Sequence, residues 1–137
     1  MNVKDLATAV AESSLSPLER VRFLNLCEAR SVDMLAEDVD RVEGHLSLLE
    51  AAAAVNNLVD ADLAQSVAGT LLALLADRNR LSFEERRLLA GAVEYFVMTG
   101  DSDNDMASPV GLVDDAKVTN ATAEALGRPD LVIPVVD

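Results

Sequence analysis

Apolar residues recur at steps of three and four along most of the chain, which is the spacing of one face of an α-helix. The most regular run lies between about Ser31 and Asn57. Its apolar positions keep this spacing over three heptads: Val32, Leu35, Val39, Val42, Leu46, Leu49 and Ala53. No segment alternates between apolar and polar residues for long enough to build a sheet. The pattern therefore predicts an all-α fold.

Helix start signals divide the chain into about six helices. Ser16-Pro17-Leu18-Glu19 and Ser82-Phe83-Glu84-Glu85 each place a serine three positions before a glutamate, the spacing of a capping box. Asp60 is suited to cap a helix from about Ala61 to Ala76. A short amphipathic helix is expected near the N-terminus, around Val3 to Val10.

Stop signals define the C-terminal part. Gly100 is expected to end the helix that opens at Ser82, and Gly127 followed by Pro129 to end the last helix near Leu126. The segment from Leu131 to Val136 is expected to be extended. We therefore predict a single domain over residues 1–137, with a helical bundle over 1–100 and an acidic loop, a last helix and a tail over 101–137.

One glycine interrupts the heptad run. Gly44 costs about 1 kcal/mol relative to alanine in a helix interior. A division of this segment into two helices at Gly44 therefore stays open.

Composition and charge narrow the function classes. The 137 residues are 50% apolar and carry a formal net charge of -13. Such a chain folds around an aliphatic core, while its charge repels nucleic acids and anionic lipid headgroups. The longest apolar run, Leu71 to Ala76, is too short to insert into a membrane. The lone Cys27 and the absence of an apolar leader favour the cytoplasm.

Acidic residues concentrate on the heptad helix around a single arginine, Arg41. They are Asp33, Glu37, Asp38, Asp40, Glu43 and Glu50. Pairing with a second copy would set Asp38 against Glu43, which is unfavourable. The leading hypothesis is therefore a small interaction domain, an adaptor, regulator or immunity-type inhibitor, that binds a protein with a basic surface. A face kept acidic for solubility is the alternative.

A basic cluster precedes and opens the helix that starts at Ser82: Arg78, Arg80, Arg86 and Arg87. In a chain of net charge -13 we expect these arginines to pair with the acidic helix of residues 33–50. An anion site is the alternative, although no glycine-rich phosphate loop accompanies them.

A second acidic concentration follows Gly100. Asp101, Asp103 and Asp105 alternate as in a calcium loop, and Asp114 or Asp115 would complete a nonstandard site if the loop folds back. The loop is not an EF-hand, since Met106 replaces the turn glycine and Leu112 the glutamate ligand. The alternative is structural, with Asp114 and Asp115 capping the last helix. Calcium is the one cofactor that the sequence suggests.

The same segment resembles the YkvA-like family of small bacterial domains of unknown function. Six positions fall in register with the family signature: Tyr95, Asp101, Asp105, Gly111, Asp114 and Asp115. Thr99 and Asn104 stand where the family has prolines. The resemblance implies a helix, an acidic turn and a second helix, and it brings no catalytic activity with it. Many relatives resemble membrane-associated proteins, an association that the polar Ser102 and Asp103 argue against here.

No catalytic residue is assigned. His45 is the only histidine and is far in sequence from Cys27, and zinc would need more of both residue types. A metal-dependent hydrolase built on carboxylates alone stays open, if Glu94 converges on the acidic loop.

Overall fold

The computed structural model describes residues 32–55, 60–97 and 109–133. These ranges hold four α-helices and two short 3-10 helices. In chain order they are α3 (Val32–Val55), α4 (Ala61–Ala76), η1 (Arg78–Arg80), α5 (Phe83–Val97), α6 (Pro109–Ala125) and η3 (Pro129–Leu131). No strand occurs in these ranges, so the all-α prediction is confirmed for them. The helices expected around Val3 to Val10 and after Ser16 lie outside the described residues, as does the Gly100 stop.

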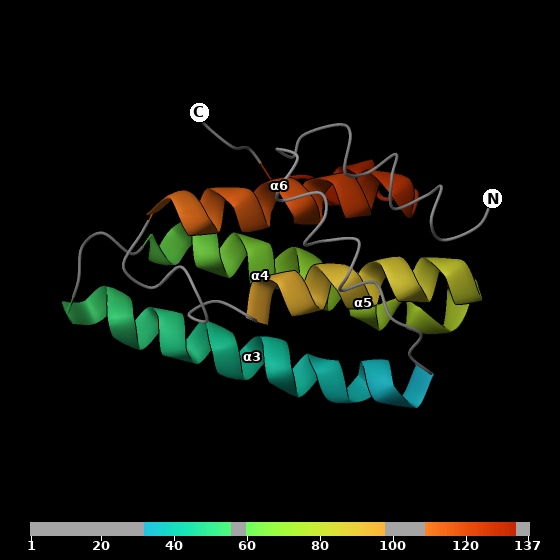
Figure 1. The fold of residues 1–137 in the computed structure, drawn as a ribbon, viewed down its shortest axis with the longest axis horizontal. Coiled ribbons are helices and arrows are strands. Elements are labelled where there is room, and N and C mark those ends of the chain that lie inside the picture. The colour runs from blue at the N-terminus through green and yellow to red at the C-terminus, as the bar shows by residue number, and fades with distance from the viewer. Residues whose placement is uncertain (1–31, 56–59, 98–108, 134–137) are drawn as a thin grey trace.

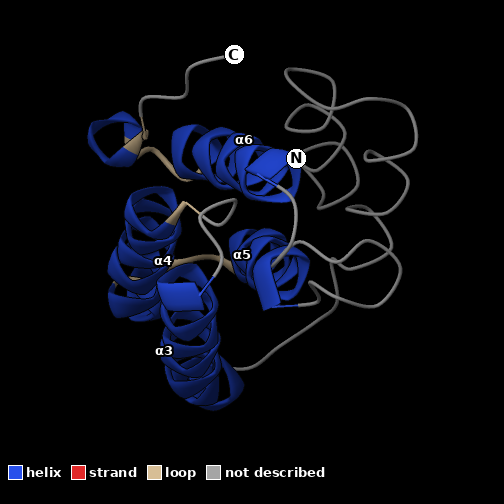
Figure 2. Ribbon diagram, turned by 90° about the vertical axis from the view of Figure 1, so that its left-hand side faces the viewer, coloured by secondary structure: helices blue, strands red, loops and turns tan. Residues whose placement is uncertain are grey.

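The four α-helices form a bundle in which successive helices run in opposite directions (Figure 1). Figure 2 shows α4 and α5 side by side, with α3 and α6 on opposite sides of this pair. The contacts agree, because α3 and α6 each pack against both α4 and α5. Two elements far apart in the sequence, α3 and α6, are therefore joined through the same two central helices.

Local side-chain caps explain where α4 and α5 begin. The Asp60 carboxylate accepts a hydrogen bond of 3.0 Å from the backbone N–H of Leu63. Ser82 and Glu85 form a reciprocal capping box: the Ser82 hydroxyl accepts from the Glu85 N–H at 3.1 Å, and the Glu85 carboxylate from the Ser82 N–H at 2.9 Å. Both predicted start signals are confirmed, because each satisfies N–H groups that a helix leaves unpaired.

The core is aliphatic apart from Phe96 and Tyr95. The predicted heptad stripe supplies its α3 side, with Leu35, Val42 and Leu49 fully buried. The apolar residues of α5 fill the middle, as the wide apolar surface of that helix indicates. Helix α3 runs unbroken through Gly44. The burial of the stripe on both sides of this glycine outweighs its modest helix penalty.

The C-terminal end of α6 follows a glycine-terminated pattern. Gly127 has a φ of 78°, and hydrogen bonds run from the N–H of Gly127 to the carbonyl of Glu124 and from the N–H of Arg128 to that of Ala123. This is a Schellman motif, which satisfies carbonyls that the helix end leaves free. The predicted stop is confirmed.

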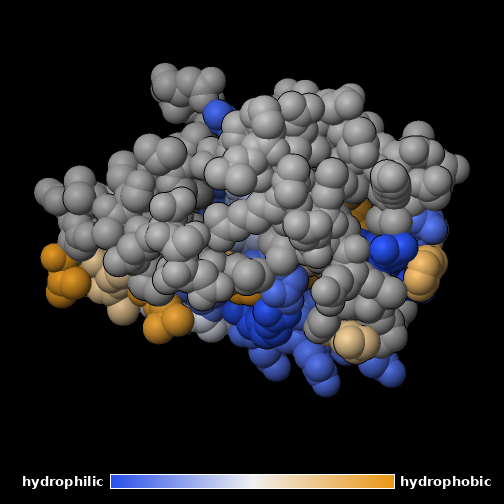
Figure 3. All heavy atoms as spheres, viewed as in Figure 1, coloured by the Kyte–Doolittle hydropathy of each residue, from blue (hydrophilic) through white to orange (hydrophobic). Residues whose placement is uncertain are grey.

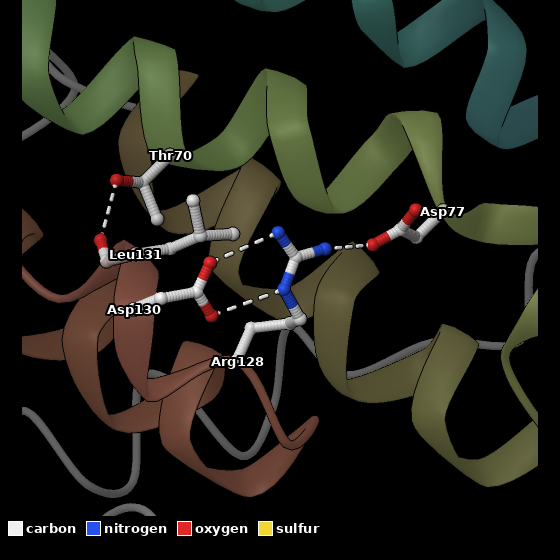
Figure 4. A network of polar contacts seen from close by, with 5 residues as sticks. All are labelled: Thr70, Asp77, Arg128, Asp130 and Leu131. Atoms are coloured by element: carbon white, nitrogen blue, oxygen red, sulfur yellow. Dashed lines mark hydrogen bonds and ion pairs between the residues drawn. The ribbon is translucent and has the colours of Figure 1, made fainter.

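The residues after this stop pack back against α4 and α6. Leu131 belongs to η3, so the expectation of an extended segment is wrong for that residue, whereas the backbone of Val132 is extended. Residues 134–136 of the predicted extended segment lie outside the described residues. The Thr70 hydroxyl of α4 donates to the Leu131 carbonyl at 2.8 Å (Figure 4). The Asn120 side chain donates to the Ile133 carbonyl at 2.8 Å and accepts from the Ile133 N–H at 2.7 Å. These bonds provide the backbone pairing that a strand would otherwise need.

The start of α6 also differs from the expectation. The helix begins at Pro109, and its first turn contains no acidic residue. Asp114 and Asp115 therefore lie beyond the first turn, and their predicted role as caps of this helix is wrong. Proline suits a first helical position because its fixed φ matches the helix and its missing N–H is not needed there.

Candidate interaction surface

Four carboxylates form an exposed surface on the N-terminal half of α3, which we call the acidic face: Asp33, Glu37, Asp40 and Glu43. They lie on the solvent side of the helix, because Leu35, Val42 and Leu49 turn the other side into the core. No ion pair or side-chain hydrogen bond joins these four carboxylates to another residue in the described ranges. Their charges are thus directed into solvent.

Asp38 is buried, unlike the four exposed carboxylates of the acidic face. Its side chain is only 1% exposed and receives a hydrogen bond of 3.0 Å from the Arg41 guanidinium. The sequence placed Asp38 with the partner-binding residues, whereas the structure places it inside the bundle. Asp38 and His45 are seven residues apart and both buried, because α3 packs against α5 as well as α4.

Arg41 is the one basic side chain of α3, and it connects two helices. It pairs with Asp38 of its own helix and with Glu94 of α5. The hydrogen bond to Glu94, followed by that to Asp38, raises the pKa of Arg41, and burial opposes the rise. The positive charge of Arg41 is therefore paired with Asp38 and Glu94, and it does not neutralise the carboxylates of the acidic face.

Glu50, the last acidic residue predicted on this helix, lies about two helical turns beyond Glu43, in the C-terminal half of α3. Its exposed carboxylate accepts a hydrogen bond of 2.8 Å from the Gln65 side chain of α4. It thus belongs to the boundary between α3 and α4, and a partner would have to compete with Gln65 for it.

The basic cluster makes contacts that the sequence did not predict. Arg78 donates to the Leu75 carbonyl and Arg86 to the Leu81 carbonyl, each at 2.9 Å. The guanidiniums of Arg86 and Arg87 each lie 5.9 Å from the centre of the Phe83 ring. An ion pair between α3 and α5 joins Arg41 of the acidic helix to Glu94. Arg78 and Arg86 bond to backbone carbonyls near chain turns, and Arg86 and Arg87 lie beside an aromatic ring.

His45 is buried on α3 against Phe96 of α5. Burial lowers the pKa of the imidazole, because desolvation disfavours its charged form. This position is that of a core histidine packed on an aromatic ring.

The predicted calcium loop falls mostly outside the described residues, which exclude Asp101, Asp103 and Asp105. Asp115 is buried within α6, on a surface shared with Thr119 and Thr122. Glu94, which a carboxylate hydrolase would require, is paired with Arg41. In the part of the chain that the structure describes, no three His, Cys, Asp or Glu residues gather where they could hold a metal ion. Calcium binding stays a prediction from the sequence.

A cavity of about 480 Å³ opens where α4, η1, α5 and the end of α6 meet. Its lining includes Asp77 and Arg128, which pair with each other, and the apolar side chains Leu74, Leu81 and Leu126. Arg128 also binds Asp130 through two nitrogens, at 3.1 Å each (Figure 4). Since Arg128 is held by two carboxylates, it is poorly placed to recognise an anionic ligand.

Three large apolar residues of α3 are exposed, Met34, Leu48 and Val55, and the sequence pattern did not predict them as surface residues. Leu48 is 57% exposed and Val55 is 88% exposed, although both belong to a helix with a regular buried stripe. The signal that identifies them is their spacing of seven residues, outside that stripe.

Comparisons of the chain with protein-family models, with curated proteins and with solved structures found no match. The resemblance to the YkvA-like family stays a prediction from the positions quoted above. No helix in the described ranges is long and apolar enough to cross a membrane.

Proposed function

We propose that this protein is a small acidic interaction domain, of the adaptor, regulator or inhibitor type, that binds a protein with a basic surface through the acidic face of α3. One observation carries the proposal: four exposed carboxylates share that face without an internal partner, while Arg41 of the same helix is neutralised by Asp38 and Glu94.

Electrostatics gives this face a direct role in recognition. Exposed charges at an interface mainly accelerate encounter and select partners of opposite charge, and the net charge of -13 adds a long-range field of the same sign. The same charges are screened within about 10 Å at 0.1 M salt. The complex should therefore form fast and weaken as salt is added.

The YkvA-like resemblance is kept as part of the proposal. This resemblance implies a helix before the acidic loop and a helix after it. The end of α5 at Val97 and the start of α6 at Pro109 support this arrangement.

Charge variants test the acidic face. Glu37→Gln with Asp40→Asn removes two charges from the face, and Asp62→Asn with Glu124→Gln removes two exposed charges from α4 and α6. Each tagged variant is incubated with lysate of the native cell, with calcium and with chelator, and washed with rising salt.

We expect the chain to retain a basic protein, and the first variant to bind it about three- to tenfold more weakly, as two exposed ion pairs would give. The control variant should bind within about twofold of the unmodified chain. Equal binding by both variants, or retention that ignores salt, would contradict the proposal. Retention only with calcium would favour the acidic loop instead.

A further inference from the structure

Three residues of the acidic face, Asp33, Glu37 and Asp40, form one end of a longer exposed stripe, and Glu43 lies beside it. The residues of α3 that follow Asp33 at steps of four or three are all exposed. We call this set the outer stripe: Asp33, Glu37, Asp40, Gly44, Leu48, Ala51 and Val55. At about 100° per residue these positions lie within roughly a quarter of the helix circumference. They face away from the buried stripe of Leu35, Val42 and Leu49.

The outer stripe divides into two chemical halves. Its first three members are carboxylates, and its last four, Gly44, Leu48, Ala51 and Val55, are small or aliphatic. We call these four the apolar end. Figure 3 shows hydrophobic side chains gathered over the C-terminal part of α3 and hydrophilic ones farther along the same side. Leu48 and Val55 are two of the four large hydrophobic residues exposed among the described ones.

Gly44 lies where the two halves meet. A Cβ placed on it would meet no atom within 4 Å, so the fold itself does not require glycine here. Gly44 has no side chain, so it leaves a shallow place in the stripe between its neighbours Asp40 and Leu48. Another backbone can approach such a place closely.

We propose that the outer stripe of α3 is the docking surface for a single amphipathic helix of the partner. Its basic side chains lie along Asp33, Glu37 and Asp40, and its aliphatic side chains pack on Leu48 and Val55. This inference rests on the proposed function and specifies the chemistry and geometry of the partner. A helix fits because the stripe keeps heptad-like steps from Asp33 to Val55, which corresponds to a straight length of about 33 Å along the helix axis.

Two other occupants fit the stripe less well. A second copy aligned in parallel would oppose carboxylates to carboxylates, and an antiparallel copy would place carboxylates on Leu48 and Val55. A lipid surface matches the apolar end but is repelled by the adjacent carboxylates when it is anionic. A basic amphipathic helix complements both halves at once.

Photocrosslinking maps the occupant. Benzoylphenylalanine replaces Glu37, Leu48 or, as the control, the exposed Ser66 of α4, and the full chain is irradiated in lysate of the native cell. We expect positions 37 and 48 to crosslink the same partner segment at sites about 11 residues apart, the separation that two parallel helix axes give. Lysine or arginine should surround the first site and aliphatic residues the second, and Ser66 should give neither crosslink.

A pair of glycine variants separates docking from stability. Gly44→Leu and Gly69→Leu each replace an exposed helical glycine with open space around it by a better helix former. We expect both to fold at least as stably as the unmodified chain. Gly44→Leu should weaken partner binding about tenfold or more through steric overlap, whereas Gly69→Leu should leave it unchanged.

The outcomes distinguish the two proposals. The helix-docking inference is overturned if the partner still depends on Glu37 and Asp40 but position 48 gives no crosslink, or if Gly44→Leu binds normally. In either case the proposal for the acidic face stands. A further outcome is that phosphatidylcholine vesicles retain the unmodified chain but not Leu48→Ser. This result would show that the apolar end binds a membrane, and it would overturn the inference. If no protein is bound or crosslinked under any condition, both proposals fail.

Discussion

The imidazole of His45 meets the ring of Phe96 edge to face, with ring centres 4.8 Å apart and planes at 87°. Because burial lowers the pKa of His45, the folded chain resists protonation at pH values where the unfolded chain accepts it. The unfolded state then binds more protons as the pH falls below about 6.5. His45 therefore leaves stability unaffected above that pH and lowers it progressively below.

His45→Gln checks this dependence. Urea midpoints are measured for both chains at about pH 7.5 and about pH 5.5, on either side of the usual histidine pKa. The unmodified chain should lose more stability between the two pH values than the variant, since the carboxylates are common to both. An equal loss in the two chains would show that His45 becomes charged as readily in the folded state as in the unfolded one.

Removal of Arg41 should cost more than removal of the Glu94 charge. Arg41→Ala takes the guanidinium away from Asp38, whose side chain is only 1% exposed, and we expect a loss of about 1–3 kcal/mol in the free energy of unfolding. Glu94→Gln removes a carboxylate that is 23% exposed, and we expect about 0–1 kcal/mol. Urea unfolding measures both, and the reverse order would mean that Asp38 depends little on Arg41.

The capping box predicts a third stability change. Ser82→Ala removes the hydroxyl that accepts from the Glu85 N–H and should cost about 1 kcal/mol. Ser66→Ala, on the exposed side of α4, is the matched control and should change stability by less than about 0.5 kcal/mol. Thermal unfolding monitored by circular dichroism compares them. Similar midpoints for the two variants would contradict the assigned cap.

The Asn120 side chain should hold the segment after α6 in place. Asn120→Ala leaves both the N–H and the carbonyl of Ile133 without their side-chain partner, and we expect a loss of about 1–3 kcal/mol. Thr70→Val removes one bond, to the Leu131 carbonyl, and should cost about 1 kcal/mol. Limited proteolysis after residue 126 should accelerate more for Asn120→Ala, and unchanged cleavage would show that other contacts retain the segment.

The predictions that held depend on local chemistry. Asp60 and Ser82 bond to N–H groups three residues away, and Gly127 sets a backbone conformation that few other residues adopt. Such signals need no knowledge of the rest of the fold. The start of α4 at Ala61 was predicted for this reason.

The start of α6 was missed because two signals competed. Asp114 and Asp115 have the composition of a first helical turn, whereas Ser108-Pro109 repeats the serine and proline that mark Ser16-Pro17. In the structure, α6 begins at Pro109. The serine and proline pair was therefore the better signal for the start of α6 than the two aspartates.

The burial of Asp38 could not be predicted from the sequence, for a different reason. A heptad pattern describes a helix that contacts one neighbour, and it places Asp38 and His45 on the flank of the seam. Because α3 packs against both α4 and α5, its contact surface is wider, and this flank is covered. Only the arrangement of whole helices shows which charges of an acidic helix remain available to a partner.

The position of α4 and α5 between the two outer helices also determines which helices can separate first during unfolding. Since α3 and α6 lie on opposite sides of α4 and α5, either outer helix can separate while the two central ones stay in contact (Figure 2). Loss of α4 or α5 removes the support of both outer helices at once. Backbone amides of α4 and α5 should therefore exchange with solvent deuterium only through global unfolding, and those of α3 through a smaller opening. A partner bound along α3 would slow that smaller opening first.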